Sequence, residues 1–442
     1  MKSYSSYKDS GVEWIGNIPS DWGNTKLKYV SQLFTGNSLN DEQKKLYESE
    51  NLNDIPYVSS KDIDVDFRTV NYDNGLRIPR DNNPLKISPT GSFLLCVEGG
   101  SSGRKMVFLD RDVCFVNKLC SFYSSQNTKF QYYFVQSSNF QDKFKLSLTG
   151  LIGGVSISTL KNFELPLPPL SEQTQIVSFL DTKTQKIDEL IEKTEQKIKL
   201  LKEKRTSLIN HCVTKGLNPD VEMRDSGVEW IGEIPRDWKL LKFWLIISSS
   251  DLGGNYNCSS EYEGYPVMKM GNLGRGSINL KKIEYIDNNS NVDKNHILQN
   301  GDFLFNTRNS KELVGKVSLW KNELPISIYN SNILRICFNK NVSNDYMNYL
   351  FNSNSILDVL KMISKGTTNV SGIYFKDLSN IYICLPSKHE QTQIVEYLDE
   401  QTQNIDSTIE KETQRIELLK EYRQSLISEV VTGKVDVRDY NG

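Results

Sequence analysis

The chain has 442 residues, a mass of 50.6 kDa and a net charge of −2, and it is too long for a single hydrophobic core, so two or more domains are predicted. Its 38% apolar and 24% charged residues are typical of a soluble globular protein, and no apolar run reaches the roughly 20 residues of a membrane span. The N-terminus lacks the apolar stretch of a signal peptide, so we expect a cytoplasmic protein with no membrane contact, and the near-neutral charge gives no overall indication of nucleic-acid binding.

A segment near the N-terminus is the first part of an internal duplication. Residues 9–16, Asp-Ser-Gly-Val-Glu-Trp-Ile-Gly, recur at 225–232, and the match continues through Ile-Pro-x-Asp-Trp. Further along, residues 172–177, Glu-Gln-Thr-Gln-Ile-Val, recur at 390–395. The halves diverge between these blocks. Each half is therefore predicted to be a variable globular module that a shared lead-in precedes and a shared segment follows.

The variable modules, residues 23–165 and 239–385, are predicted to be mixed α/β structures that share a fold. Short runs rich in β-branched and aromatic residues, such as 92–97 and 333–338, are separated by Asn, Gly, Asp and Ser. Aromatic patches between these runs suit short helices. We therefore expect an irregular sheet with a few helices in each module.

The shared segments that follow the modules are predicted to be long helices. Prolines precede both segments, and Ser171 and Ser387 are the predicted N-caps. Neither segment contains Pro or Gly before Gly216 and Gly433, which makes both far longer than the mean helix of about 12 residues. At 1.5 Å per residue each helix would be on the order of 60 Å long.

Seam residues in both segments alternate in steps of four and three, which is the period of a coiled coil. Two such helices related by a twofold axis must run antiparallel and would hold the modules apart in inverted orientation. Polar seam positions, including Arg205 and Arg423, are expected to cost stability and to fix the register. Two separate amphipathic helices, each packed on its own domain, are the alternative. The predicted seam consists of Leu180, Ile187, Ile191, Ile198, Leu201 and Leu208 in the first copy and of Leu398, Ile405, Ile409, Ile416, Leu419 and Leu426 in the second.

The C-terminal tail indicates that the duplication is cyclic. Residues 431–439 resemble residues 213–225, which lead directly into the second lead-in. The C-terminus therefore ends about where the N-terminus begins. Such a cycle predicts a pseudo-twofold arrangement with neighbouring termini.

Several loops of the modules combine Lys or Arg with Ser, Thr, Asn and Gly, which suits a DNA surface. Glycine lets the backbone approach closely, hydroxyls and amides bind phosphates, and Arg and Asn pair with guanine and adenine edges. Ordinary solvated turns are the alternative interpretation. The candidate DNA contacts are Ser59, Ser60, Lys61, Arg104, Lys105 and Thr149 in the first module and Lys269, Asn272, Arg275, Arg308, Lys311, Lys365, Thr367, Thr368 and Asn369 in the second.

The sequence indicates no catalytic and no metal site. The seven cysteines include no Cys-x-x-Cys pair, and the three histidines are far apart. The run Gly99–Lys105 lacks the spacing of a phosphate-binding loop, and no Asn/Asp-Pro-Pro-Tyr/Phe motif of an amino-methyltransferase is present. We therefore expect a chain that catalyses no reaction itself.

This arrangement resembles the DNA-specificity (S) subunits of type I restriction–modification systems. The resemblance covers essentially the whole chain and is most specific in the lead-ins, residues 9–22 and 225–238, and in the helix entries, residues 165–177 and 385–395. The first helix entry has the form Leu-Pro-Leu-Pro-Pro-Leu-x-Glu-Gln, from which the second, Leu-Pro-Ser-Lys-His-Glu-Gln, departs.

The resemblance implies an α/β (α+β) chain with two target-recognition domains, each of which recognises one half of a split, asymmetric sequence in double-stranded DNA. The helices would set the spacer between the halves and dock two modification (methyltransferase) subunits. Those subunits bind S-adenosylmethionine and methylate adenine N6, and restriction subunits, a translocase and nuclease that use ATP and Mg, would join them. The chain itself would then need no cofactor, and its partners could supply much of the phosphate contact.

On this basis we expect a first target-recognition domain with its lead-in at 1–170, a central coiled-coil helix at 171–215, a second target-recognition domain at 216–388, and a C-terminal coiled-coil helix with the tail at 389–442. Two alternatives remain. A non-catalytic coiled-coil protein–protein adaptor would bind no DNA with any partner. A stand-alone nuclease or methyltransferase would need catalytic carboxylates or a cofactor pocket.

Overall fold

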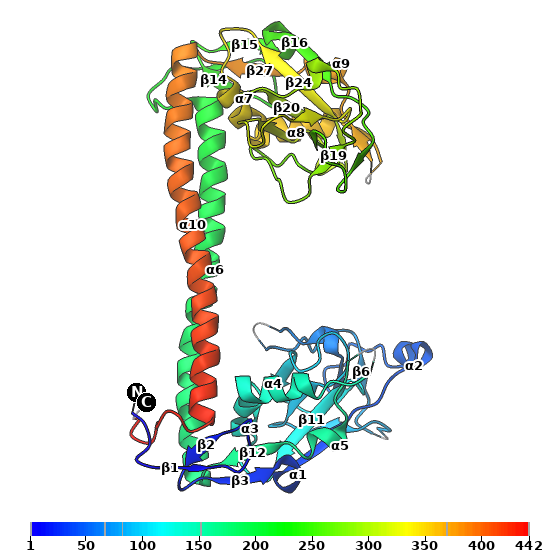
Figure 1. Ribbon diagram of the computed structural model, residues 1–442, viewed down its shortest axis with the longest axis vertical. Coiled ribbons are helices and arrows are strands. Elements are labelled where there is room, and N and C mark those ends of the chain that lie inside the picture. The colour runs from blue at the N-terminus through cyan, green and yellow to red at the C-terminus, as the bar shows by residue number, and fades with distance from the viewer. Residues whose placement is uncertain (1, 66–67, 82, 151–152, 368–369, 441–442) are drawn as a thin grey trace. The chain divides into compact units, whose positions relative to one another are not determined.

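The computed structural model describes residues 2–65, 68–81, 83–150, 153–367 and 370–440. The chain divides into two compact units, one formed by Met1–Gln196 with Thr413–Gly442 and the other by Lys197–Glu412. Each unit contains one α/β module and a part of each long helix (Figure 1). None of the helices in these described ranges is long and apolar enough to cross a lipid bilayer.

The first module is built on two four-stranded sheets. One sheet is wholly antiparallel, in the order β4-β11-β8-β9, and the other, in the order β6-β5-β10-β7, includes the parallel pair β5 and β10. Two pairs, β1-β2 and β3-β12, form the lead-in and the base of the module. The strands are β1 (Tyr7–Asp9), β2 (Asn17–Pro19), β3 (Gly23–Lys26), β4 (Ser31–Thr35), β5 (Ile55–Val58), β6 (Arg77–Ile78), β7 (Ile87–Ser88), β8 (Phe93–Cys96), β9 (Met106–Phe108), β10 (Val113–Phe115), β11 (Leu119–Ser124) and β12 (Glu164–Leu167). The helices are α1 (Leu27–Val30), α2 (Asp41–Leu46), η1 (Ser60–Asp62), α3 (Thr128–Phe134), α4 (Ser138–Leu146) and α5 (Ile157–Leu160).

The second module repeats this architecture. Its sheets have the orders β16-β24-β20-β22 and β17-β19-β18-β23, the latter with the parallel pair β18 and β23, and a small sheet β21-β26-β25 is added. The strands are β13 (Met223–Asp225), β14 (Glu233–Pro235), β15 (Lys239–Lys242), β16 (Ile247–Leu252), β17 (Cys258–Ser259), β18 (Pro266–Met268), β19 (Glu284–Ile286), β20 (Phe303–Asn306), β21 (Arg308–Asn309), β22 (Val317–Leu319), β23 (Ile328–Tyr329), β24 (Ile333–Phe338), β25 (Lys365–Gly366), β26 (Ser371–Gly372) and β27 (Tyr382–Leu385). The helices are η2 (Phe243–Ile246), η3 (Lys294–His296), α7 (Asn344–Phe351), α8 (Asn354–Ile363) and α9 (Phe375–Ser379). The predicted mixed fold, common to both modules, is confirmed.

One inner strand of each antiparallel sheet, β8 in the first module and β20 in the second, is buried along its whole length. Phe93 of β8 stacks on Phe122, and the two ring centroids are 4.5 Å apart. The next residue, Leu94, belongs to a core cluster that includes Val58 of β5 and Phe115 of β10. Alternate side chains of one strand thus enter two cores, because successive residues point to opposite faces of a sheet.

The shared segments form α6 (Leu170–Lys215) and α10 (Lys388–Val431), and the predicted long helices are confirmed. Ser387 does precede its helix, and its Oγ accepts a hydrogen bond from the Glu390 amide at 3.2 Å. The predicted N-cap role of Ser171 is wrong. The first helix begins one residue before Ser171, and the Gln173 amide donates to the Pro169 carbonyl at 2.9 Å.

The two helices run antiparallel within each unit, as predicted. In the first unit, Arg423 pairs with Asp188 at 2.9 Å. In the second unit, Lys197 pairs with Glu412 at 2.5 Å and Arg205 pairs with Asp406 at 2.9 Å, so residue numbers rise along one helix as they fall along the other. The apolar residues of the predicted seam are buried or half-buried throughout.

Each module is attached to its helix pair by an equivalent tyrosine. Tyr133 of α3 donates from its hydroxyl to Asp181 of α6 at 2.7 Å. In the second unit, Tyr349 of α7 donates to Asp399 of α10 at 2.6 Å. The duplication therefore extends to the contacts between module and helix.

The two termini lie side by side in the first unit (Figure 1), as the cyclic repeat predicts. The Asp436 amide donates to the Lys2 carbonyl at 2.9 Å, and the guanidinium of Arg438 lies 4.7 Å from the ring centre of Tyr4. The Tyr4 hydroxyl in turn donates to Glu172 of α6 at 2.6 Å.

Candidate nucleic-acid interface

The predicted loops of the first module come together in space. The loop between β8 and β9 meets the loop that precedes α5, where the Gly99 amide donates to the Gly153 carbonyl at 3.0 Å. The same β8–β9 loop meets the turn after β5, where the ammonium group of Lys105 donates to the Ser60 carbonyl at 2.7 Å. Three segments that are distant in sequence therefore form one surface.

The turn after β5 is fixed by Asp62. Its carboxylate accepts hydrogen bonds from the Ser59 amide at 2.8 Å and from the Ser59 hydroxyl at 2.6 Å. Asn74 donates from its side-chain amide to the same carboxylate at 2.9 Å and to the Tyr57 carbonyl at 2.8 Å. The Ser59 side chain thus shapes the turn, while Lys61 remains exposed.

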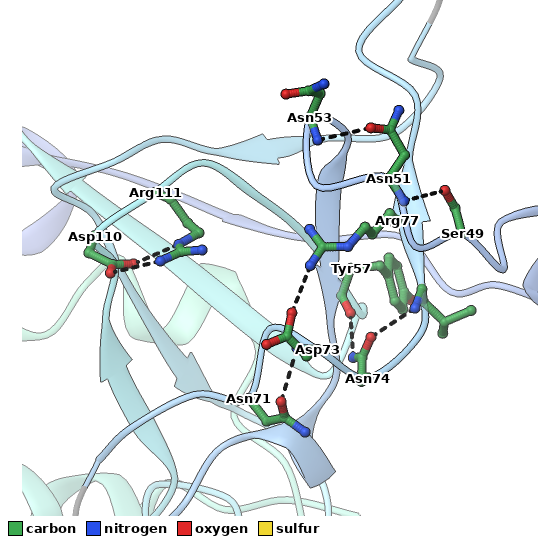
Figure 2. A network of polar contacts seen from close by, with 11 residues as sticks. Ser49, Asn51, Asn53, Tyr57, Asn71, Asp73, Asn74, Arg77, Asp110 and Arg111 are labelled. Atoms are coloured by element: carbon green, nitrogen blue, oxygen red, sulfur yellow. Dashed lines mark hydrogen bonds and ion pairs between the residues drawn. The ribbon is translucent and has the colours of Figure 1, made fainter.

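A polar network supports this turn from the segment that precedes β6. Figure 2 shows the side chain of Asn74 reaching the Tyr57 carbonyl, and close to it the ion pair between Arg77 and Asp73 at 2.8 Å. The Arg77 side chain is 6% exposed, whereas that of Asp73 is 82% exposed. Asn74, which bonds both the Tyr57 carbonyl and the Asp62 carboxylate, connects this segment to the turn, and the ion pair satisfies the buried Arg77 guanidinium beside it.

Two hollows open among these loops. The first, of about 480 Å³, is lined by Lys61 and Lys105 together with Asp62 and neighbouring residues. The second, of about 610 Å³, is lined by Thr149 and its flanking glycines and also by Glu98 and Asn117. Arg104 is exposed on the β8–β9 loop beside them.

The equivalent loops of the second module also come together. Arg308 of β21 and Lys365 of β25 both pair with Gly372 of β26. They line a hollow of about 560 Å³ with Thr307 and Tyr374. The Lys365 ammonium donates to Asp377 at 2.6 Å, whereas the Arg308 guanidinium is exposed.

Asn272 has a role within its own loop. It is 5% exposed, its side-chain oxygen accepts from the Lys269 amide at 2.9 Å, and its amide group donates to the carbonyls of Asn279 and Lys282. Asn272 therefore occupies the position that Asp62 occupies in the first module and has no free atom for a base. Lys269 is half-buried and paired with Glu284.

The second module also has a cationic patch formed by Arg275, Lys311 and Lys316. The Arg275 guanidinium donates to the Glu312 carbonyl at 3.0 Å, next to the exposed Lys311. Desolvation lowers the pKa of Arg275. Desolvation, together with the nearby charge of Arg275, also lowers the pKa of Lys316. An anion bound between the Arg275 and Lys316 side chains would offset both the desolvation of the two cations and the repulsion that Lys316 experiences from Arg275, so this patch suits a phosphate.

The remaining candidates divide into two groups. Thr367 is exposed, and its amide donates to the Val370 carbonyl at 2.9 Å in a tight turn. Thr368 and Asn369 lie outside the described residues. Three residues of these surfaces, Glu98, Asn117 and Lys316, are not among the sequence-based candidates. Glu98 and Asn117 carry no positive charge, and the strand pairing that brings Glu98 to the hollow has no local sequence signal. Lys316 directly precedes β22 and lies outside the selected loops.

The two modules place these residues on the same backbone positions. The Val116 amide donates to the Val58 carbonyl, as the Asn330 amide does to the Met268 carbonyl, both at 3.0 Å. The pairing of Glu98 with Gly154 has its counterpart in the pairing of Arg308 with Gly372. Hence the hollow beside Thr149 and the hollow beside Lys365 are equivalent.

Comparison with known proteins identifies this architecture. The family model described as "Type I restriction modification DNA specificity domain" matches residues 19–200 and 254–420. The chain is 24% identical over 441 residues to the EcoKI specificity subunit of Escherichia coli K12, covering 95% of this chain and 90% of that protein. It is 23% identical over 439 residues to the MjaVIII specificity subunit of Methanocaldococcus jannaschii, covering 96% and 95%.

Solved structures show the same fold. A chain of the structure reported as "Structural basis underlying complex assembly and conformational transition of the type I R-M system" superposes with a TM-score of 0.72 at 16% identity, covering 95% of this chain and 99% of that one. The HsdS subunit of Thermoanaerobacter tengcongensis superposes with a TM-score of 0.52 at 16% identity, covering 95% and 98%. The chain belongs to the type I restriction–modification DNA specificity family and is a specificity subunit with two target-recognition domains.

Proposed function

We propose that this chain gives a type I restriction–modification complex its DNA sequence specificity, with each module recognising one half of a bipartite target. The observation that supports this most directly is the pair of equivalent loop clusters. They share a backbone framework but present different side chains, such as Glu98 and Arg308, at matched positions. Two copies of one fold with different surface chemistry suit two different half-sites.

The proposed DNA contacts are the exposed cations of these clusters. Lys61 and Arg104 belong to the first module, and Arg275, Arg308 and Lys311 belong to the second. Such groups neutralise phosphates or donate to guanine, and the turns that present them are held by internal hydrogen bonds. With a net charge of −2, we expect the partner subunits to supply a large part of the phosphate contact.

The partners that we propose are two modification subunits, docked on the long helices, and restriction subunits that join them. Leu200 and Leu418 support the proposal of two modification subunits, because the two leucines lie at equivalent positions of the duplicated helices and are 63% and 64% exposed. Matched apolar side chains offer the same contact twice. In this arrangement the chain is a non-catalytic subunit of an adenine-N6 methyltransferase complex, and S-adenosylmethionine, ATP and Mg belong to its partners.

The domain boundaries follow from the same proposal. We assign the target-recognition domains to residues 1–170 and 216–388 and the spacer helices to residues 171–215 and 389–442 with the tail. The variable portions, residues 23–165 and 239–385, are the units to exchange in experiments.

Sequencing of methylated adenine in cells that express this chain with its methyltransferase partner tests the proposal. A split motif that depends on the chain is expected. Replacing residues 23–165 with the corresponding segment of another specificity subunit should change one half of the motif and leave the other half unchanged. Methylation that is indifferent to deletion of the chain would refute the proposal.

A further inference from the structure

The equivalent hollows of the two modules differ in charge. In the hollow beside Thr149, Glu98 is the one charged side chain among the described lining residues. In the hollow beside Lys365, the charged lining residues that the structure describes are Arg308 and Lys365, both basic. Matched backbone positions therefore present a carboxylate in one module and a guanidinium in the other.

Neither of the two matched side chains is committed to a contact within the protein. Among the described residues, the Glu98 carboxylate and the Arg308 guanidinium have no ion pair and no side-chain hydrogen bond. Their neighbours are engaged differently: Lys365 is bonded to Asp377, and the Thr149 hydroxyl donates to the Gly154 carbonyl at 3.3 Å. The Glu98 carboxylate and the Arg308 guanidinium can therefore bind a ligand without losing a contact within the protein.

An unpaired carboxylate on a DNA-binding surface needs a donor from the DNA. Phosphates repel it, so Glu98 lowers affinity for DNA in general unless a base amino group faces it. Of the two amino groups in the major groove, that of cytosine stands without a neighbouring acceptor on its base, whereas that of adenine lies beside the N7 acceptor. A carboxylate therefore favours cytosine. A guanidinium at the same position favours guanine, whose O6 and N7 accept two parallel hydrogen bonds.

We propose that Glu98 and Arg308 are matched specificity-determining residues of the two modules. Glu98 accepts a hydrogen bond from the N4 amino group of a cytosine in one half-site, and Arg308 donates to O6 and N7 of a guanine in the other. This inference rests on the proposed function, since it assigns individual bases to the surfaces that would contact DNA. The two half-sites would then differ in base preference because the same backbone position has a negative side chain in the first module and a positive one in the second.

The test uses the complete chain with its methyltransferase partner. The split motif is first obtained by sequencing methylated adenine, and duplexes randomised within each half-site are then selected for binding. The variants are Glu98→Gln and Arg308→Gln. Glu42→Gln on α2 and Arg236→Gln in the second lead-in are the matched controls, because both side chains are exposed and lie outside the hollows.

Glu98→Gln is expected to reduce the preference for cytosine at one base pair of one half-site by roughly 5- to 100-fold, with a shift toward adenine. Arg308→Gln should do the same for guanine at one base pair of the other half-site. Glu98→Asp retains the acceptor on a shorter side chain and should weaken the cytosine preference without the shift toward adenine. The control variants should leave both halves unchanged.

Uniform weakening or strengthening at every sequence would overturn the inference, because it marks a contact to phosphate and not to a base. An unchanged motif, or changes in the same half for both variants, would also overturn it. Each of these outcomes leaves the wild-type split motif intact and so leaves the proposed function standing. Absence of any chain-dependent motif in the wild type would instead refute the proposed function itself. Melting temperatures of the complexes, expected to match the wild type, verify that binding changes are not losses of fold.

Discussion

Single residues decide how the two chain ends are held together. Asp436 accepts from the Arg438 side chain through both carboxylate oxygens, at 2.9 and 2.6 Å. These hydrogen bonds and the guanidinium charge hold the pKa of Asp436 below its usual value of 3.8. The Lys2 ammonium adds an ion pair with Asp439 at 3.0 Å. The Asp436–Arg438 contact thus orders the C-terminal tail, and the Lys2–Asp439 ion pair joins the tail to the N-terminus.

The depressed pKa of Asp436 predicts a loss of stability in acid. Its contribution is present above the unfolded pKa of about 3.8 and is lost as the pH falls through the lower folded value. Below about pH 4, the melting temperature of the wild type should therefore fall more steeply than that of Asp436→Asn. Thermal unfolding between pH 6 and about 3 measures this, and Glu50→Gln, at an exposed site, is the control. Parallel pH profiles for wild type and Asp436→Asn would contradict it.

Gly433 is predicted to be intolerant of any side chain. Its φ of 74° lies in the left-handed region, and a Cβ there would collide with the Pro19 ring and press on Trp22. Gly16 has a similar φ of 73° but open space around it, so it separates backbone strain from the collision. Gly433→Ala should destabilise by roughly 1–3 kcal/mol more than Gly16→Ala in chemical unfolding. Equal losses would show that the contact with the lead-in is loose.

At the scale of elements, the helix pair was predictable because its signal is local. Heptad spacing specifies a buried seam wherever a long helix finds a partner, and both copies of the segment have the same spacing. The arginines at seam positions looked unfavourable in sequence, but Arg423 and Arg205 each reach an aspartate of the opposite helix. These ion pairs form in only one register of the two helices, because a shift of one helix along the other would separate each arginine from its aspartate.

Seam burial predicts a contrast between two leucines of α10. Leu398 is 0% exposed, whereas Leu418 is 64% exposed. Leu398→Ala should cost about 2–5 kcal/mol of unfolding free energy, because it leaves a cavity. Leu418→Ala should change stability by less than about 0.5 kcal/mol and should instead weaken association with the modification subunit. Urea unfolding and a binding titration measure the two effects. A stability loss of similar size for both variants would contradict the proposal that Leu418 is free to contact the modification subunit.

The loop clusters were only partly predictable. The turn after β5 and the glycine-rich β8–β9 loop were identified by composition, yet nothing in the sequence indicates that Glu98 pairs with Gly154. That contact depends on strand order, and strand partners lie far apart in sequence. Selection by positive charge also missed Glu98 and selected Asn272, whose amide is used inside its own loop. Composition identifies candidate loops. Only the hydrogen bonds in the structure show which side chains of those loops are used inside the protein and which are free to contact DNA.

For the whole molecule, the cyclic duplication explains why the termini lie where they do. In the second unit the chain runs on from α6 through residues 216–222 into the lead-in strand β13. In the first unit the corresponding connection is broken, and contacts between the two ends replace it, such as the Asp436 amide bonded to the Lys2 carbonyl. The site of the termini in the first unit is therefore equivalent to the connection through residues 216–222 in the second unit.

A circularly permuted chain should therefore fold. A short flexible linker would join the present termini, and new termini would be placed between Asn218 and Asp220, which are exposed. Because the linker replaces contacts that already hold the ends together, the melting temperature of the complex with its methyltransferase partner should stay within a few degrees of the wild type. The methylation motif should be unchanged, since no residue of either loop cluster moves in sequence relative to its module. A permutation opened inside α6 at Glu195 is the control and should fail, because it interrupts the buried helix seam. Loss of folding in the permutant opened between Asn218 and Asp220 would contradict the prediction and would mean that residues 216–222 stabilise the fold as well as connecting its parts.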